Sequence, residues 1–477
     1  MQLHRAPGAS RLGRGSLARQ GCHAVSTAYF RPQCTLRCHS ADPQARLTEL
    51  DTVGAAPVWT DSLSETQRYV LADEWGFSSV GTSLPAGIAP EVLVAALPED
   101  VLEPQLGRAM QGFLAPVALI ALGLSWQWYM HSIMPVWQQL ATWVCIGTGY
   151  AGLFQLAQEC AKGCFLPEFP ATQDLVGSLL MAPSLNSFEV WRLRLFDHHI
   201  RPTELWGDSQ GSCHPLTLQQ LAAAHPWQRL VMRLVATTPL KLLMSLGDWV
   251  DGMQGWDLRE VYVGLRISVL MSWVLPAAVL GLGLPCLLVS LGWEGVINCW
   301  LGPWLVFHCW LSTLNLLRHT APHIPWRARG LKPRSYDHSR AIISHTVTTP
   351  LPGWLESLLN FPNYPVPGLL LWSGVPYYHA KAATAALREK LGPYMNEAPL
   401  SIRLLINHIT KWHVFDTDTE RYLTWEEAER RLEEQQLDQR KESLGAHGAD
   451  DGAWAVGDSP IGNGSFSSST APQMSPV

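Results

Sequence analysis

The sequence has few charged residues and lacks the short motifs that mark many soluble enzymes. Asp, Glu, Lys and Arg make up 16% of its 477 residues, whereas they make up about 25% of an ordinary soluble protein. It contains no glycine-rich phosphate loop, no nucleophile elbow and no internal repeat. Its ten Cys include no C-x-x-C pair, so most are interpreted as reduced core residues. With a net charge of −6 and no basic face, the chain is not expected to bind nucleic acid.

Acidic residues are absent from the first 41 positions. This stretch has six Arg together with many Ser, Ala and Gly, and no long apolar core. Such a composition is typical of an organelle transit peptide rather than a secretory signal. We predict a chloroplast transit peptide over residues 1–41, with a mitochondrial peptide as second choice and a disordered basic tail as the alternative.

Long uncharged runs occupy the middle of the chain. Residues 113–130 and 134–157 contain no charge, and residues 267–317 contain only Glu294. About 20 apolar residues cross a bilayer, so these runs fit four spans, with tight turns near 131–133 and 292–296. Many of the 22 Trp lie at the ends of these runs, as expected at membrane interfaces.

The predicted fold is an all-α integral membrane protein with about four transmembrane helices and a helical cap on one face. Residues 230–249 carry Arg233, Lys241 and Asp248 among apolar residues, which predicts an amphipathic helix lying in the interface. Lys and Arg are frequent in 158–262 and 318–423 but absent from both turns. The positive-inside rule therefore places both segments on the same side of the membrane.

The remaining segments are polar. Residues 42–112 are predicted to form a soluble N-terminal segment with short helices near the membrane surface. A capping-box pattern opens a charged helix at 424–444, and the Gly-, Ser- and Pro-rich residues 445–477 are predicted to be a disordered tail. Two short polar stretches, Thr203–Glu204 and Asp208–Ser209, are interpreted as ordinary surface.

Histidines gather where the apolar runs end. His198 and His199 are adjacent, and His319 and His323 follow the last run. Imidazole is a good ligand for iron, and a di-iron centre at a membrane surface would need many imidazoles in H-x3-H and H-x2-H-H patterns. The layout here matches such a centre, but several of the histidines are replaced.

Several motifs resemble the membrane fatty acid desaturase family, in particular its plastid omega-6 (delta-12) acyl-lipid branch. The similarity covers about residues 110–430, so 113–423 is interpreted as a desaturase-like membrane domain. The motifs that carry it are Gly152-Leu-Phe, Glu159-Cys-Ala, Trp191-Arg, Asp197-His-His199, Pro303-Trp-Leu with His-Cys-Trp-Leu-Ser-Thr313, His319-Thr-Ala-Pro-His-Ile-Pro325, Ser344-His-Thr-Val, Trp354-Leu-Glu and Pro393-Tyr-Met-Asn-Glu-Ala398.

The resemblance implies a di-iron cofactor held by eight histidines in three boxes, of which this chain keeps His198 and His199. His319 and His323 match a further histidine motif of the branch, although Arg318 replaces a neighbouring histidine there. These four histidines are the candidate metal ligands, and Glu159, His214, His345 and His379 are other available donors. The replaced ligand positions are Gln158, Lys162, Leu195, Pro365, Gly368 and Leu369.

Three interpretations of the site follow: a complete di-iron centre with altered ligands, a single residual metal, or polar interface histidines satisfied by carbonyls and water. We expect the di-iron centre to be absent or incomplete. The favoured function is then a non-catalytic protein that binds a membrane glycerolipid or acyl chain, or that modulates an active desaturase.

The alternative is an active plastid acyl-lipid omega-6 desaturase. For that activity the resemblance implies O2-dependent removal of two hydrogens from an acyl chain, with ferredoxin supplying electrons. A membrane binding or transport protein unrelated to acyl oxidation is a third hypothesis. The expected location is a chloroplast membrane, envelope or thylakoid, with the histidines on the stromal side.

Overall fold

A computed structural model describes residues 58–130, 133–205, 208, 214–250, 261, 263–327 and 336–450. The predicted transit peptide (1–41), residues 42–57 of the predicted soluble segment and the tail beyond 450 lie outside the described residues. Helices dominate the described chain, and the strands are only two or three residues long.

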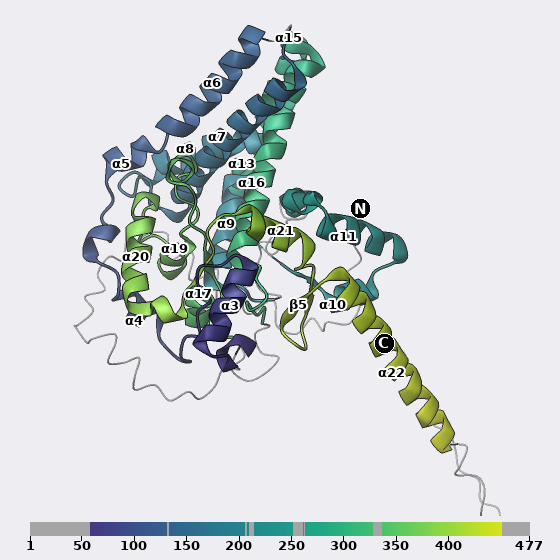
Figure 1. The fold of residues 1–477 in the computed structure, drawn as a ribbon. Helices are drawn as coiled ribbons and strands as arrows, with labels where there is room; N and C mark the ends of the chain where they lie inside the picture. The colour runs from purple at the N-terminus through teal and green to yellow at the C-terminus, as the bar shows by residue number, and fades with distance from the viewer. Residues whose placement is uncertain are drawn as a thin grey trace, which may run out of the picture. The chain divides into compact units, whose positions relative to one another are not determined.

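Three helical stretches are long and apolar enough to cross a membrane: Leu106–Met130, Val136–Lys162 and Val263–His319. The third is 57 residues long and is interrupted at Gly292, whose φ of 67° and ψ of −171° are not helical. Figure 1 shows α15 (Leu284–Val296) at the same end of the bundle as the connection between α6 (Leu114–Met130) and α7 (Val136–Lys162). The described chain therefore has four apolar helical segments, called limbs below: 106–130, 136–162, and the parts of 263–319 before and after Gly292. They form two hairpins, and the predicted all-α membrane fold is confirmed.

Helix α7 is the central limb, and it packs against α6, α8, α9 and α16. Two of its glycines allow other segments to come close. A Cβ on Gly147 would lie 2.5 Å from the carbonyl oxygen of Pro303, and one on Gly152 would lie 2.3 Å from that of Leu358. Small residues permit such close backbone approach between membrane helices. Gly163, with a φ of 83°, ends α7 in the left-handed conformation that favours glycine.

The amphipathic helix predicted over 230–249 is broken in the structure, so that prediction was wrong in its continuity. α11 (Pro226–Thr237) and the pair η5 (Pro239–Leu243) and α12 (Met244–Trp249) meet at a bend of 91°. Thr238 is extended, with a φ of −128° and a ψ of 169°, because the residue before a proline is disfavoured in the α region and Pro239 cannot continue the helix. Taken together, the two helices are apolar enough to count as one further candidate span.

Short helices surround the end of the bundle opposite α15, where Figure 1 shows α3, α4, α17, α19 and α20. Before the bundle the elements are η1 (Trp59–Ser62), α3 (Glu65–Trp75), α4 (Pro90–Val94), η2 (Glu99–Leu102) and α5 (Leu106–Gln111). Between its second and third limbs lie α8 (Pro170–Met181), η3 (Ala182–Ser184), α9 (Phe188–Ile200), β1 (Leu216–Thr217) and α10 (Leu218–Ala223). The last two limbs comprise η7 (Val263–Leu265), α13 (Arg266–Ser272), α14 (Val274–Ala278), the π-helix η8 (Val279–Gly283), α15, the π-helix η9 (Ile297–Leu301) and α16 (Gly302–His319).

The segment after α16 folds into small helices and strands. These are α17 (His338–Ile343), β2 (Val347–Thr348), α18 (Gly353–Leu358), α19 (Pro365–Leu370), η10 (Tyr377–His379), α20 (Ala380–Leu391), η11 (Gly392–Tyr394), β3 (Asn396–Glu397), α21 (Ile402–Thr410), β4 (Val414–Asp416) and β5 (Arg421–Leu423). β2 pairs in parallel with β3, while β4 lies between β1 and β5. α22 (Trp425–Asp450) runs beyond the predicted end at Leu444, and Glu426–Val477 is a separate unit.

A buried carboxylate holds the chain that leads into α19. Glu356 of α18 is 1% exposed. Its Oε1 accepts hydrogen bonds from Asn363 Nδ2 at 3.0 Å and Tyr364 Oη at 2.7 Å, and its Oε2 accepts one from Lys381 Nζ at 2.9 Å. Because buried polar groups are costly when unpaired, this set of contacts fixes residues 363–369 beside the bundle.

Candidate functional site

A single cavity collects most of the positions that the sequence singled out. It has a volume of about 60 Å³ and lies where α7, α9, α16 and α19 meet. Three candidate histidines line it, namely His198, His199 and His319. All six replaced ligand positions line it as well: Gln158, Lys162, Leu195, Pro365, Gly368 and Leu369. Segments that lie about 200 residues apart in the sequence therefore meet at this cavity.

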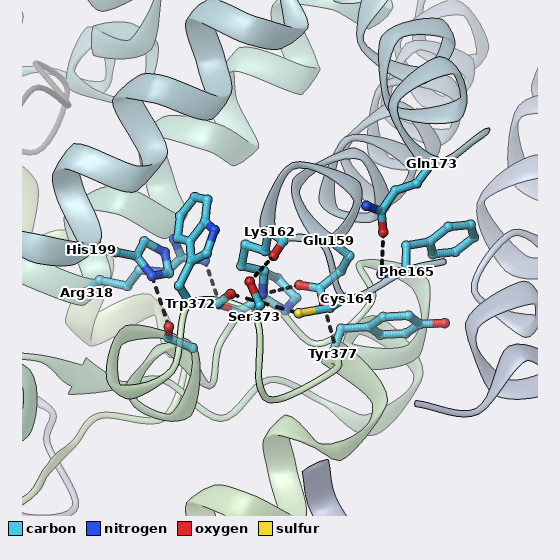
Figure 2. A network of polar contacts seen from close by, with 12 residues as sticks. Glu159, Lys162, Cys164, Phe165, Gln173, His199, Arg318, Trp372, Ser373 and Tyr377 are labelled. Atoms are coloured by element: carbon cyan, nitrogen blue, oxygen red, sulfur yellow. Dashed lines mark hydrogen bonds and ion pairs between the residues drawn. The ribbon is translucent and has the colours of Figure 1, made fainter. Parts of the chain in front are cut away.

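Lys162 and Glu159 form a buried ion pair at the end of α7. Lys162 Nζ contacts Glu159 Oε1, and the two side chains are 11% and 1% exposed. Glu159 Oε2 accepts a hydrogen bond from the Tyr377 backbone N–H at 3.0 Å, and Ser373 Oγ donates to the Lys162 carbonyl at 2.7 Å. Figure 2 shows this pair between His199 and Tyr377. The pair joins α7 to the chain that follows α19.

The Lys162 ammonium lies close to His199. A Cβ built on Gly368 would be 3.8 Å from Lys162 Nζ and 3.9 Å from His199 Cε1, so both groups border the same point. His199 Nδ1 is 2.9 Å from the Gly368 carbonyl. A carbonyl only accepts, so Nδ1 is the donor and Nε2 holds the lone pair. Burial lowers the pKa of His199 well below its usual value, and His198 and Lys162 add to this effect.

The other two imidazoles of the cavity differ in their surroundings. His198 Nδ1 is 2.7 Å from Asp208 Oδ2, and its ring centroid is 5.1 Å from that of His319. His319 is 1% exposed, and neither of its ring nitrogens makes a well-aligned hydrogen bond to a described residue. Carboxylate–histidine contacts such as His198–Asp208 often orient a metal ligand, although they also satisfy buried histidines in proteins without metals.

The fourth candidate ligand, His323, is not among the residues that line the cavity. Its Nε2 is 2.9 Å from Asn396 Oδ1, and its ring stacks on Trp75 at 5.4 Å between centroids. The helix α16 ends at His319, and Thr320 is extended, which carries His323 into a different environment. Asn396 also donates to the Ser344 carbonyl at 2.6 Å. His323 therefore links three of the motifs that carry the family resemblance.

Three polar residues that the sequence assigned to the surface, Thr203, Glu204 and Asp208, are buried. Asp208 is 4% exposed, and Thr203 and Glu204 are 1% and 6% exposed. That interpretation was wrong because the chain after α9 turns back, with Thr203 at a φ of 57°, and brings Asp208 onto His198. Sequence reasoning missed Asn315 and Tyr377 as lining residues of the cavity, whereas Arg318, which stands where the motif has a histidine, lines it too. Arg318 Nη2 donates to the Pro362 carbonyl at 2.6 Å.

The side chains around this cavity do not fit two iron ions. Three imidazoles and the Glu159 carboxylate line it, together with the Lys162 ammonium, the Arg318 guanidinium and the aliphatic groups of Leu195, Pro365 and Leu369. An ammonium has three N–H donors and no lone pair, so Lys162 cannot act as a ligand while it is charged. Among the residues that the structure describes, no group of three or more His, Cys, Asp or Glu could hold a metal ion.

The cavity is also too small for an acyl chain. A cavity needs about 10–15 Å³ of space to hold one water molecule, so a volume of about 60 Å³ suits small polar occupants such as water. A second cavity of about 20 Å³ adjoins it through Gln155, Gln158 and Asn315, and it extends between α7 and α16 towards Trp310. Neither is an open acyl tunnel in this conformation.

Buried neutral histidines outside the cavity make stability depend on pH, and His408 of α21 is the clearest example. Burial lowers its pKa from 6.5 to about 4. As the pH falls through 6.5 the unfolded chain binds a proton that the folded chain does not, so folding becomes less favourable. We expect His408 to contribute a loss of about 2 kcal/mol between pH 8 and pH 5. Unfolding in mixed micelles at both pH values measures the total loss.

The matched variant for this measurement is His408→Gln, whose amide can hydrogen-bond but does not titrate in this range. The loss between pH 8 and pH 5 should be smaller in the variant than in the unchanged chain by about 2 kcal/mol. An identical loss in both proteins would show that His408 is not the group responsible.

The fold and this cavity define an integral membrane protein with a histidine-containing polar site at one end of an apolar helix bundle. No model of a known protein family matches the chain, but curated proteins do. The omega-6 fatty acid desaturase, chloroplastic, of Glycine max is 28% identical over 355 residues, which are 74% of this chain and 80% of the relative. That of Spinacia oleracea is 28% identical over 359 residues, 75% of this chain and 76% of the relative.

A bacterial relative agrees with these plant proteins. The sn-1 oleoyl-lipid 12-desaturase of Synechocystis sp. is 26% identical over 327 residues, which are 68% of this chain and 89% of the relative. The resemblance of this chain to membrane fatty acid desaturases is therefore supported by relatives that match 68–75% of its length.

Proposed function

We propose that the protein acts in lipid metabolism as a desaturase-like membrane protein that lacks a complete di-iron centre and carries out no oxidative chemistry. The observation that carries this proposal is the position of the Lys162 ammonium. A Cβ built on Gly368 would lie 3.8 Å from Lys162 Nζ and 3.9 Å from His199 Cε1. A cation held there by Glu159 takes the place of a ligand and repels a metal dication. The aliphatic side chains at Leu195, Pro365 and Leu369 supply no donors.

The proposed partner is a membrane glycerolipid or its acyl chain, and an active desaturase is the protein partner that such a chain could modulate. Because the cavities are small, lipid contact would involve the exposed apolar surface of the bundle. The plant relatives are named chloroplastic, which supports a chloroplast membrane, with the histidine-bearing face towards the stroma as the positive-inside rule predicts.

The alternative is an active omega-6 acyl-lipid desaturase with altered ligands. Two observations favour it: the named activity of the relatives, and the buried His319, whose ring nitrogens have no well-aligned partner among the described residues. In that case Gln158 or Glu159 would have to join the three imidazoles as iron ligands, and Lys162 would have to move away from His199.

Iron content separates the two proposals. We expect the full chain, purified from iron-supplemented cells, to contain only trace iron, because too few neutral donors line the cavity. Elemental analysis per mole of protein is the measurement. The Glycine max relative, purified in parallel, shows whether the procedure retains iron. Two irons per chain in the present protein would contradict the proposal.

A second measurement tests activity directly. Expression of the mature chain in a desaturase-deficient host that supplies ferredoxin should leave the fatty acid profile unchanged, whereas the Glycine max relative should restore unsaturated chains. Immunoblots of the membrane fraction establish equal expression. A new double bond produced by the present protein would favour the alternative.

A further inference from the structure

Helix α11 presents an apolar stripe that no described part of the chain covers. Trp227, Leu230, Val231 and Leu234 are 46%, 68%, 51% and 52% exposed. Their spacing of i, i+3, i+4 and i+7 places them on one face of the helix. The neighbouring η5 adds Leu240, which is 44% exposed. One face of a surface helix is therefore apolar and unpartnered over its whole length.

Helix α21, which lies about 170 residues later in the sequence, adds a second apolar stripe. Ile402 and Ile406 are 78% and 52% exposed, while Leu404, Asn407 and His408 on the other face are buried. α11 packs against α21. The seven exposed apolar residues of these elements are called the α11–α21 surface below: Trp227, Leu230, Val231, Leu234, Leu240, Ile402 and Ile406.

A buried lysine holds these elements together. Lys241 of η5 is 4% exposed, and its Nζ donates to the carbonyls of His408 at 2.7 Å and Trp412 at 2.5 Å. The His408 carbonyl lies in the last turn of α21, where carbonyls have no partners within the helix, and Trp412 follows the end of that helix. The arrangement of α11 and α21 is therefore a built feature of the fold.

Hydrogen bonds anchor α12, which follows α11 and η5, to the bundle. The Ser245 backbone N–H of α12 donates to Ser312 Oγ of α16 at 2.9 Å, and Ser245 Oγ donates to the His308 carbonyl at 2.9 Å. Figure 1 shows α11 lying crosswise to α7 and α16 and close to α21. A helix in this orientation beside a membrane limb can lie in the plane of the membrane surface.

The charge near the surface is positive. No Asp or Glu occurs between Asp208 and Asp248, or between Glu397 and Asp416. Arg229 and Arg233 belong to α11, and Arg229 donates to the carbonyls of Ala224 and Ala222. The cations of α21 and its end, Arg403 and Lys411, pair with acidic residues of α3. α11 thus contributes two arginines and no acidic residue to this part of the protein.

We propose that the α11–α21 surface is a membrane-contact site that lies in the headgroup region of the bilayer and prefers anionic lipids. The apolar stripe would be buried at the boundary between headgroups and acyl chains, and the two arginines would attract anionic headgroups. The sequence predicts one interfacial helix at 230–249, whereas the structure assigns the contact to α11 together with α21. This proposal does not depend on whether the protein is catalytic.

The test uses the full chain in nanodiscs that contain phosphatidylglycerol and phosphatidylcholine. The photo-crosslinking residue p-benzoylphenylalanine is introduced at Leu230 or at Ile406. A matched control places it at Glu91 of α4, which is exposed but lies outside this surface. Mass spectrometry identifies the adducts. We expect lipid adducts at both test positions and none at the control position.

The lipid preference has its own readout. We expect phosphatidylglycerol to be enriched among the adducts relative to its share of the bilayer, by about fivefold for each arginine that contributes. The double variant Arg229→Gln/Arg233→Gln should lose this enrichment but still form lipid adducts. Protein adducts, or no adducts, at Leu230 and Ile406 would overturn the membrane contact. Lipid adducts without anionic enrichment would overturn the preference.

Discussion

The substitution Lys162→Met is expected to lower the free energy of unfolding by about 3–5 kcal/mol, because it leaves the buried Glu159 carboxylate without its cation. The double variant Glu159→Gln/Lys162→Met should recover most of this loss. A glutamine at 159 still accepts the hydrogen bond that the Tyr377 N–H makes to Glu159 Oε2, and replacing both charges removes the burial penalty. Unfolding by SDS in mixed micelles compares the three proteins.

Lys381→Met is the matched control. Lys381 also pairs with a buried glutamate, Glu356, but its own side chain is 60% exposed. Glu356 keeps the hydrogen bonds from Asn363 and Tyr364, so the control should cost less than about 1 kcal/mol. If Lys162→Met lowered the free energy of unfolding no more than the control does, Lys162 would not be the cation that neutralises the Glu159 carboxylate.

The ion pair between Glu159 and Lys162 explains why the uncharged run in the sequence indicates where α7 begins but not where it ends. The uncharged run was predicted to stop at Ala157, whereas α7 continues to Lys162. Hydropathy counts Glu159 and Lys162 as two charges that end a span. In the fold they neutralise each other, so the helix can continue into the protein interior. A sequence pattern does not show that pairing.

The convergence of the site was predictable, whereas its detailed contacts were not. The family resemblance identified many of the lining residues, among them the six replaced positions and His198, His199 and His319, and the structure brings them together. His323 is separate because α16 ends at His319. Asp208 reaches His198 only because the chain turns back at Thr203, a non-glycine residue with positive φ. The sequence contains no turn motif that would have revealed this.

The break at Pro239 is a different case, because its signal was present in the sequence. Thr238-Pro239 ends a helix by the ordinary rules of proline, and apolar periodicity alone suggested that the helix continues. The structure follows the proline, and the resulting bend of 91° turns α11 away from α12. Local backbone chemistry thus overrides a hydrophobic pattern where the two disagree.

Restoring all six histidines is expected to convert the chain from trace to stoichiometric iron binding. The variant carries Gln158→His, Lys162→His, Leu195→His, Pro365→His, Gly368→His and Leu369→His. It removes the Lys162 ammonium, and the cavity would be lined by nine imidazoles that can act as neutral ligands. A side chain at Gly368 has room, since its Cβ would meet only ordinary contacts at 3.8 and 3.9 Å, both to residues of the cavity.

Elemental analysis and the Mössbauer spectrum of protein loaded with ⁵⁷Fe measure the result. The control restores five histidines but keeps Lys162, and it should bind much less iron, because even the loss of one supporting partner lowers metal affinity by about 10–100-fold. Thermal unfolding and size-exclusion chromatography establish that both variants fold. A folded six-histidine variant that stays free of iron would show that this cavity is not the former site of a di-iron centre.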